Sequence, residues 1–141
     1  MRSLSPQQPT KVSTAKTLEK IQSFWAPKLV GSLNKAYEIK LAKLSGEFVW
    51  HSHPDTDELF FVISGVLTIK FREPGASHEL DDVTLAPGEL LVIPKGVRHC
   101  PVTQKGEEVA VMLLEPTGVI NTGDAATTEG LTNAVEDFRQ T

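Results

Sequence analysis

The 141-residue sequence predicts an all-β fold, a sandwich or a barrel, preceded by one short helix. Two observations support this prediction. From residue 37 onward, short β-branched and aromatic runs follow one another, and glycine or proline turns separate them at near-regular spacing. Between residues 37 and 116 no segment is long enough for the crossover helix that a parallel sheet requires, so an α/β fold is disfavoured.

Each strand is expected from its own pattern and from the turn that ends it. In the first, Tyr37, Ile39 and Leu41 alternate with residues of another type, which is the period of a strand. The second is an apolar run that ends at Gly65, and the third starts directly after that glycine. The expected strands are 37–42, 58–64, 66–72, 79–85, 89–93, 99–103 and 109–115.

A short amphipathic helix is expected before the strands. Its N-cap would be Ser13 or Thr14, and Pro27 would end it. The apolar residues of this segment recur at intervals of three and four, the spacing of one helix face: Leu18, Ile21 and Trp25.

The length is that of a single domain, and the two ends of the chain differ in pattern from its middle. Residues 1–12 are poor in apolar groups and are expected to form a flexible arm. Residues 13–116 would form the β-barrel domain with its N-terminal helix, and residues 117–141 a C-terminal tail. Within that tail, Leu131, Val135 and Phe138 have the spacing of a weak terminal helix.

Composition narrows the classes of function. The formal net charge of −4 argues against a general nucleic-acid binder, which would need a basic face. No apolar run approaches the length of a membrane span, and the start of the chain lacks the apolar stretch of a secretory signal. Cys100 is the only cysteine, so no disulfide can form within the chain, and a reducing, cytoplasmic location is expected.

Three of the four histidines fall in a pattern that metal chemistry explains. His51 and His53 are separated by one residue, so on a strand both imidazoles point to the same face. Glu58 follows a short turn that would bring its carboxylate beside them, and His99 would join from a neighbouring strand. Imidazole nitrogens and carboxylate oxygens are common ligands of divalent metals. Each short motif alone is more often an ordinary histidine, so the metal interpretation depends on their combination.

The spacing of glycines and prolines around these residues resembles the two conserved signatures of the cupin superfamily. The first signature is G-x5-H-x-H-x3–4-E-x6-G, and its conserved positions correspond here to Gly46, His51, His53, Glu58 and Gly65. The second signature is G-x5-P-x-G-x2-H-x3-N, and its conserved positions correspond here to Gly88, Pro94, Gly96, His99 and Thr103. Two positions depart from the pattern, because only four residues separate Gly46 from His51 and because Thr103 stands in place of asparagine.

The resemblance implies a double-stranded β-helix, the jelly-roll barrel built from two packed sheets. It also implies a mononuclear site inside the barrel for one divalent transition metal (Fe, Mn, Zn, Ni, Co or Cu). More narrowly, the sequence resembles the small single-domain cupins that are loosely grouped with mannose-6-phosphate isomerase, a grouping that does not itself assign an activity. The metal ligands implied are His51, His53, Glu58 and His99.

These features predict a metal-binding protein that acts on a small molecule. Three imidazoles and one carboxylate leave one or two coordination positions open, which favours a metal-dependent enzyme. Two reactions fit: isomerisation or epimerisation of a small hydroxy or sugar substrate, and dioxygenation of a small ring or enol. The alternative is a cupin that holds a metal or small ligand without turnover. The catalytic acid or base is unassigned, the resemblance implies a homodimer, and neither nucleic acid nor a membrane is an expected partner.

Strand parity predicts the surroundings of the site. If Glu58 points inward, Phe60 and Val62 do too, whereas Trp50 and Cys100 point away from the ligands next to them. Cys100 is therefore expected to be a buried apolar residue rather than a ligand or nucleophile. The remaining charged residues near the motifs are expected at the surface or in turns: Lys43, Asp55, Asp57, His78 and Arg98.

Overall fold

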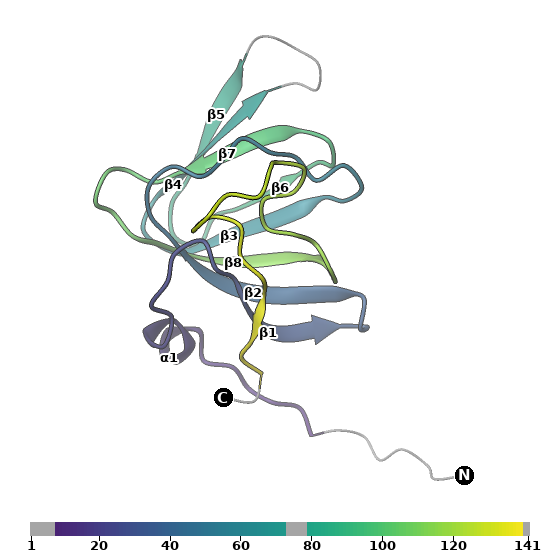
Figure 1. Cartoon of the computed structure of the whole chain (residues 1–141). Coiled ribbons are helices and arrows are strands. Elements are labelled where there is room, and N and C mark those ends of the chain that lie inside the picture. The colour runs from purple at the N-terminus through teal and green to yellow at the C-terminus, as the bar shows by residue number, and fades with distance from the viewer. Residues whose placement is uncertain (1–7, 73–78, 140–141) are drawn as a thin grey trace.

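The computed structural model describes residues 8–72 and 79–139 of the chain. Its elements are α1 (Thr14–Glu19), β1 (Lys28–Leu33), β2 (Tyr37–Leu44), β3 (Glu58–Ser64), β4 (Leu67–Arg72), β5 (Glu79–Leu85), β6 (Leu90–Ile93), β7 (Arg98–Val102), β8 (Val109–Pro116) and β9 (Glu136–Asp137). Among these residues, one sheet has six strands in the order β6-β3-β8-β2-β1-β9, and the other has three in the order β5-β4-β7 (Figure 1). The predicted all-β jelly roll with a short N-terminal helix is confirmed.

Every predicted strand is present, with its ends shifted by at most a few residues. β1 is a strand that the sequence did not predict. Gly31 interrupts its apolar run, and the pairing of β1 with β2 shifts register between Leu29 and Gly31. Because an irregular strand of this kind has no sustained period-two pattern, its sequence does not stand out.

The predicted helix is present but shorter than expected. Its N-cap is Ser13, whose hydroxyl oxygen accepts a hydrogen bond from the backbone N–H of Lys16 at 3.3 Å. The helix ends at Glu19, so the expectation that it continues to Trp25 was wrong. Trp25 has a φ of 58°, and its backbone N–H donates to the carbonyl of Lys43 on β2. Packing of this tryptophan into the barrel therefore overrides the helical spacing.

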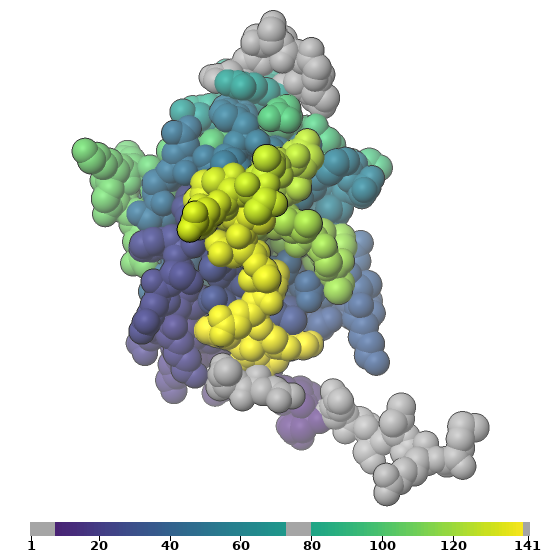
Figure 2. Space-filling model, viewed as in Figure 1, coloured from purple at the N-terminus to yellow at the C-terminus, as the bar shows by residue number. Residues whose placement is uncertain are grey.

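The expected terminal helix is also absent from the described residues, where a turn at 129–132 is followed by an extended segment, 133–138, that includes β9. Its backbone groups find partners elsewhere. The N–H of Phe138 donates to the carbonyl of Leu29, and the N–H of Asn133 donates to the side chain of Asn121. These contacts hold the segment against the six-stranded sheet, and Figure 2 shows it in yellow lying along one face of the molecule.

Two apolar clusters hold the structure together. The larger lies between the sheets and includes Val62, Leu67 and Ile69, all fully buried. The smaller lies where α1 covers the outer face of the six-stranded sheet, around Leu18 and Leu41. Each fully buried aliphatic side chain contributes about 1.5–3 kcal/mol. No helix in residues 8–72 or 79–139 is long and apolar enough to cross a membrane.

Candidate metal centre

Two chain segments position the three histidines. The segment that carries His51 and His53 pairs with β7, where His51 lies opposite His99. The backbone N–H of His51 donates to the carbonyl of His99 at 3.0 Å, and the N–H of His99 donates back at 2.8 Å. Glu58 is the first residue of β3 and points inward, as do Phe60 and Val62. The strand parity expected from the sequence is therefore confirmed.

The four expected ligand residues form one cluster. Each contributes one nitrogen or oxygen atom to a set whose members lie within 4.8 Å of one another. Nε2 of His53 lies 3.4 Å from Oε2 of Glu58, and Nε2 of His99 lies 3.4 Å from Oε1 of the same carboxylate. Ligand atoms bound to one ion at about 2.0–2.2 Å lie roughly 3.0–3.5 Å apart when they are adjacent. The cluster is therefore able to bind a metal ion.

Hydrogen bonds to the backbone orient two of the imidazoles. Nδ1 of His51 lies 2.8 Å from the carbonyl of Val49, and Nδ1 of His99 lies 3.0 Å from that of Val97. A carbonyl can only accept, so each Nδ1 carries the proton and each Nε2 presents its lone pair to the cluster. In the described structure, Nε2 of His53, Nε2 of His99 and Oε1 of Glu58 are buried without a hydrogen-bond partner. Buried polar atoms are costly when unpaired, and a metal ion would satisfy all three.

Burial and mutual charge shift the acid–base behaviour of the cluster. Burial lowers the pKa of His51 to about 4, and the neighbouring His99 adds to that effect. For His53, burial acts in the same direction, but the carboxylate of Glu58 outweighs it and raises the pKa. His53 and His99 in turn hold the pKa of Glu58 well below its usual range, against the effect of its burial. The lowered pKa values of His51 and Glu58 favour the neutral imidazole and the carboxylate that bind a cation, whereas the raised pKa of His53 means that a bound cation would have to displace its proton.

The family model described as a cupin domain matches residues 38–115, which include all four residues of the cluster. The chain is a cupin. Part of it, 61 residues and 43% of its length, is 41% identical to the uncharacterised protein YdbB of Bacillus subtilis (strain 168). The match covers 49% of that relative, so the chain spans about half the length of this curated protein.

Solved structures show the same fold. A cupin-2 domain containing protein from Shewanella frigidimarina NCIMB 400 is 41% identical, with a TM-score of 0.66, over 74% of this cupin and 93% of that chain. Hydroquinone 1,2-dioxygenase from Sphingomonas sp. TTNP3, crystallised with 4-hydroxybenzoate, has a TM-score of 0.61 over 82% of this cupin and 83% of that chain. At 13% identity, the second likeness concerns the fold alone.

The two departures from the cupin signatures contact each other. The hydroxyl oxygen of Thr103 accepts a hydrogen bond from the N–H of Gly46 at 2.7 Å, and the carbonyl of Gly46 accepts one from the N–H of Thr103 at 2.9 Å. This pair joins the segment that leads to His51 with the end of β7, which carries His99. The departures therefore leave the frame of the cluster intact.

The C-terminal segment supports the histidines from outside. Asp124 accepts hydrogen bonds from the backbone N–H and the hydroxyl of Ser52 at 2.7 and 3.0 Å, and its own N–H donates to the carbonyl of Ser52. Gly123, with a φ of 54°, lies so close that a Cβ at this position would overlap the Ser52 carbonyl. The same Cβ would lie 3.1 Å from Cδ2 of His51. Sequence patterns did not indicate this support, because it depends on contacts between residues 72 positions apart.

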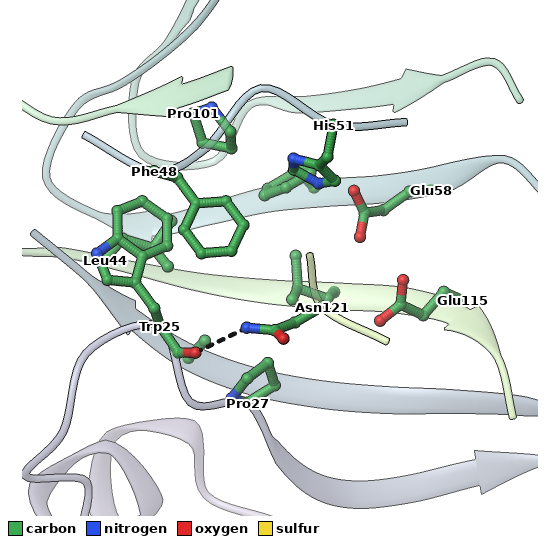
Figure 3. Close-up of a pocket in the computed structure, with 12 residues that line it drawn as sticks. Trp25, Pro27, Leu44, Phe48, His51, Glu58, Pro101, Glu115 and Asn121 are labelled. Carbon is green, nitrogen blue, oxygen red and sulfur yellow. Dashed lines mark hydrogen bonds between the residues drawn. The ribbon is translucent and has the colours of Figure 1, made fainter. Parts of the chain in front are cut away.

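A small cavity of about 30 Å³ adjoins the cluster. Its walls are mostly apolar, and the rings of Trp25 and Phe48 stack there with centroids 4.5 Å apart. In Figure 3 these rings lie on one side of the pocket and the carboxylates of Glu58 and Glu115 on the other. The side chain of Asn121, from the C-terminal segment, also lines the pocket and donates to the carbonyl of Trp25 at 3.0 Å.

Glu115 is a pocket residue that sequence reasoning missed. Its side chain is only 1% exposed, and its Oε1 accepts a hydrogen bond at 2.9 Å from Nζ of Lys40, which is equally buried. Burial and the charge of Glu58 raise the pKa of Glu115 to about 8, although Lys40 acts in the opposite direction. The alternation of the strands could have revealed it. Lys40 lies two positions from the inward-facing Ala42, and Glu115 lies two positions from the inward-facing Leu113, so both charged side chains are expected to point into the barrel.

The other residues considered from sequence are not members of the cluster in the described part of the chain. Cys100 is fully buried, as expected, and burial raises the pKa of its thiol to about 11. Lys43 lies 3.4 Å from Glu108, and Arg98 lies 3.7 Å from Asp124. Arg72 covers the ring of Trp50 at 4.0 Å. Asp57 accepts a hydrogen bond from the N–H of Lys95 in a turn, and His78 lies outside the described residues.

Proposed function

We propose that this cupin is a metal-dependent enzyme in which His51, His53, Glu58 and His99 hold one divalent transition metal ion. Its substrate would be a small, neutral, largely apolar molecule that carries hydroxyl groups, such as a phenol or an enol. The reaction that best fits is dioxygenation. The observation that carries this proposal is the apolar, aromatic wall directly beside a buried cluster of three imidazoles and a carboxylate.

The lining of the pocket argues for this substrate class over a sugar phosphate. A phosphorylated substrate needs cationic or N–H donors, usually arginine or lysine. In the described part of the chain, the residues that line the cavity include no lysine or arginine, whereas they include two carboxylates, Glu58 and Glu115. The nearby Lys40 is already paired with Glu115 at 2.9 Å. An anionic substrate body would therefore be disfavoured in this pocket.

A metal bound at the cluster would supply an open coordination position and either Lewis-acid or redox chemistry. The residues of the chain have separate tasks. His51 and His99 present Nε2 because their Nδ1 protons are held by backbone carbonyls. The stacked rings of Trp25 and Phe48 form an apolar wall that would exclude water from the cluster. Dioxygenation transfers both atoms of O2 to the substrate, so it needs no external reductant.

Isomerisation or epimerisation is the second candidate, and Glu115 favours it. This reaction moves a proton on the substrate, for which an acid or base with a pKa near the working pH is suited. Glu115 lines the pocket, is not part of the metal cluster, and has a pKa raised to about 8. The substrate would be a neutral hydroxycarbonyl compound, for the same reasons of charge.

Metal analysis followed by oxygen-uptake assays would test the proposal. We expect about one metal ion per chain in the wild type and loss of metal in His51→Ala and His99→Ala, whereas His78→Ala, outside both motifs, keeps it. Loading with Fe(II) should then give oxygen uptake with a phenol or enol from a panel. A wild type that takes up no metal on reconstitution would refute the metal site. A metal-loaded protein that consumes no oxygen but isomerises a neutral hydroxycarbonyl compound would favour the second candidate.

We propose further that two copies associate through the outer face of β6, β3 and β8. Cross-strand pairs on this face are apolar, with Leu59 opposite both Val92 and Leu114, and Phe61 opposite Leu90. Leu90 and Val92 are 57% and 48% exposed, and such patches often mark interfaces. Sedimentation should give a dimer for the wild type and a monomer for Leu90→Lys, and a monomeric wild type would contradict this. A cytoplasmic location remains our proposal, on the basis of the single cysteine.

A further inference from the structure

The residues of the metal cluster are shut off from solvent in the described structure. None of His51, His53, Glu58 and His99 is more than 4% exposed. The cavity of about 30 Å³ beside them holds a few water molecules at most, since one water needs about 10–15 Å³ of such volume. A small-molecule substrate can therefore reach the cluster only if some part of the protein moves.

The walls of the barrel are not the part that moves most easily. β2 pairs with β8 along its whole length, and β3 pairs with both β8 and β6. Separation of these strands would break consecutive backbone hydrogen bonds and expose the larger apolar cluster between the sheets. The free energy of such an opening approaches that of global unfolding. The movement is therefore expected in an element that covers the barrel and is held by fewer contacts.

The 118–125 loop, which follows β8, covers the metal cluster from outside. Asn121 lines the inner cavity, and a Cβ on Gly123 would lie 3.1 Å from Cδ2 of His51. The opposite side of the same loop faces solvent, because Ile120 is 59% exposed. Figure 2 shows this part of the chain, in yellow-green, at the surface of the molecule. A single layer of chain therefore separates the cluster from solvent on this side.

Few contacts hold the 118–125 loop to the barrel. Among the described residues, its backbone makes one hydrogen bond outside the C-terminal segment, from the N–H of Asp124 to the carbonyl of Ser52 at 3.0 Å. The side chain of Asp124 also accepts from Ser52, and that of Asn121 donates to the carbonyl of Trp25. Neither apolar cluster of the described structure includes a residue of this loop. Segments with so few buried apolar contacts open at a low free energy.

A groove of about 250 Å³ lies outside the cluster, between the 118–125 loop and the loop that carries His53. It is much larger than the inner cavity, and its lining is partly apolar. The lining residues are His53, Pro54, Asp55, Thr56, Gly118, Val119, Ile120 and Gly123. Gly123 borders this groove and also lies against His51, which borders the inner cavity. Movement of Gly123 away from Ser52 would therefore join the two spaces.

We propose that the 118–125 loop is a lid, and that its separation from Ser52 admits the metal ion and the small-molecule substrate to the cluster from this groove. Asp124 keeps the lid closed through its hydrogen bonds to Ser52. The inference rests on the proposed function, to which it adds the route of entry and the element that controls it. Closure of the lid behind the substrate excludes bulk water from the cluster.

Amide hydrogen exchange in the metal-free wild type tests whether the lid opens on its own. The N–H of Asp124 is bonded across the lid, so its exchange reports separation from Ser52. It should exchange at least about 100-fold faster than the protected amides of β2 and β8, and low concentrations of urea should leave its rate unchanged. Exchange of the Asp124 amide only through global unfolding would overturn the lid.

A disulfide that ties the lid shut tests whether its opening controls entry. Ser52→Cys/Asp124→Cys places two thiols where the native side chains lie 3.0 Å apart, within the reach of a disulfide. The probe is Mn(II), which has little affinity for thiols, and the electron paramagnetic resonance of free Mn(II) follows its uptake. Uptake and release should both be at least about 10-fold slower in the oxidised variant than in the reduced one, because both need the same opening. A disulfide that merely distorted the cluster would speed release instead.

The neutral quencher succinimide tests the same route for a small planar molecule. In a Trp50→Phe background Trp25 is the remaining tryptophan, and its ring lines the inner cavity. The dependence of its fluorescence on succinimide should be weaker in the oxidised variant than in the reduced one. Thr68→Cys/Thr84→Cys is the matched control, since these hydroxyls lie 3.1 Å apart between β4 and β5, away from the lid. Its oxidation should change neither the Mn(II) rates nor the quenching.

The outcomes separate the lid from the proposed function. Equal Mn(II) rates and equal quenching in the oxidised and reduced lid variants would overturn the lid but leave the metal site standing. Wild type that takes up no Mn(II), Zn(II) or Fe(II) would refute the metal site, while exchange at Asp124 and quenching of Trp25 would still show whether the lid opens. If the disulfide does not form, the exchange of the Asp124 amide decides the question.

Discussion

Gly123 offers a sharp test of the idea that the C-terminal segment supports the metal cluster. The substitution is Gly123→Ala. A Cβ at this position would overlap the Ser52 carbonyl and lie 3.1 Å from Cδ2 of His51, and the φ of 54° is unfavourable for alanine. To relieve the overlap, the C-terminal segment and the loop that carries His51 and His53 must separate, which removes the support that Asp124 gives to Ser52. The position of the imidazoles should therefore change.

Gly130 provides the matched control. Its φ is 79°, also left-handed, but a Cβ at this position would have no atom of the described residues within 4 Å beyond its chain neighbours. Gly130→Ala should therefore cost only the backbone strain, about 1–2 kcal/mol of unfolding free energy. Gly123→Ala should cost that amount plus about 1–3 kcal/mol for the overlap. Both substitutions reduce the entropy of the unfolded chain equally, so this effect cancels in the comparison.

Urea unfolding of the metal-free proteins would measure the difference in stability, and competition with a chelator would measure zinc affinity. We expect Gly123→Ala to be the less stable variant and to lose about 10-fold or more in zinc affinity, the size of loss typical when support of metal ligands is disturbed. Gly130→Ala should bind zinc as the wild type does. Equal stability of the two variants, or wild-type zinc affinity in Gly123→Ala, would refute the reasoning.

Four other predictions follow from the same structure. Zinc at 100 times its dissociation constant should stabilise the fold by about 2.7 kcal/mol, a gain that thermal unfolding would register and a chelator would reverse. Because the pKa of His51 is lowered from 6.5 to about 4, the unfolded chain binds more protons between these values. Metal-free protein should therefore lose up to about 3 kcal/mol as pH falls from 6.5 to 4, and His51→Gln should show a weaker dependence in urea unfolding. Lys40→Met should destabilise by about 3–5 kcal/mol, whereas Lys40→Met/Glu115→Leu should be near wild type, and equal losses would contradict the buried pair. The thiol of Cys100, with its pKa near 11 and no exposure, should react with a thiol reagent only after unfolding.

The fold was predictable because most of its strands end at local signals. Turn glycines such as Gly65 and Gly88 have φ values of 79° and 86°, which only glycine adopts easily, so they mark the ends of strands in the sequence itself. β1 and the C-terminal segment lack such signals. Their backbone groups pair with distant residues, as Phe138 does with Leu29, and no local periodicity reports a contact of that kind.

The same distinction separates the metal cluster from the pocket beside it. The residues of the cluster follow a short, recognisable spacing in the sequence, since His51 and His53 lie two positions apart and Glu58 is the first residue of the following strand. The pocket combines residues from unrelated parts of the chain, including Trp25, Asn121 and Glu115. Sequence motifs therefore identify the residues of this cupin that can bind a metal ion, whereas the shape and lining of the neighbouring pocket depend on packing that only the structure reveals.

That packing also leaves a signal that sequence reasoning can use. Lys40 and Glu115 are charged residues at inward-facing positions of β2 and β8, two positions from the apolar inward residues Ala42 and Leu113. A charged residue in an interior phase costs free energy unless it has a partner, and two such residues of opposite charge point to one another. Strand register is what decides whether they meet: Lys40 pairs with Leu113 and Glu115 with Glu38, which places the two side chains on the same face, diagonally across adjacent strands. Two opposite charges at interior positions of neighbouring strands are thus a feature by which a buried ion pair beside the metal-binding cluster can be sought before a structure is known.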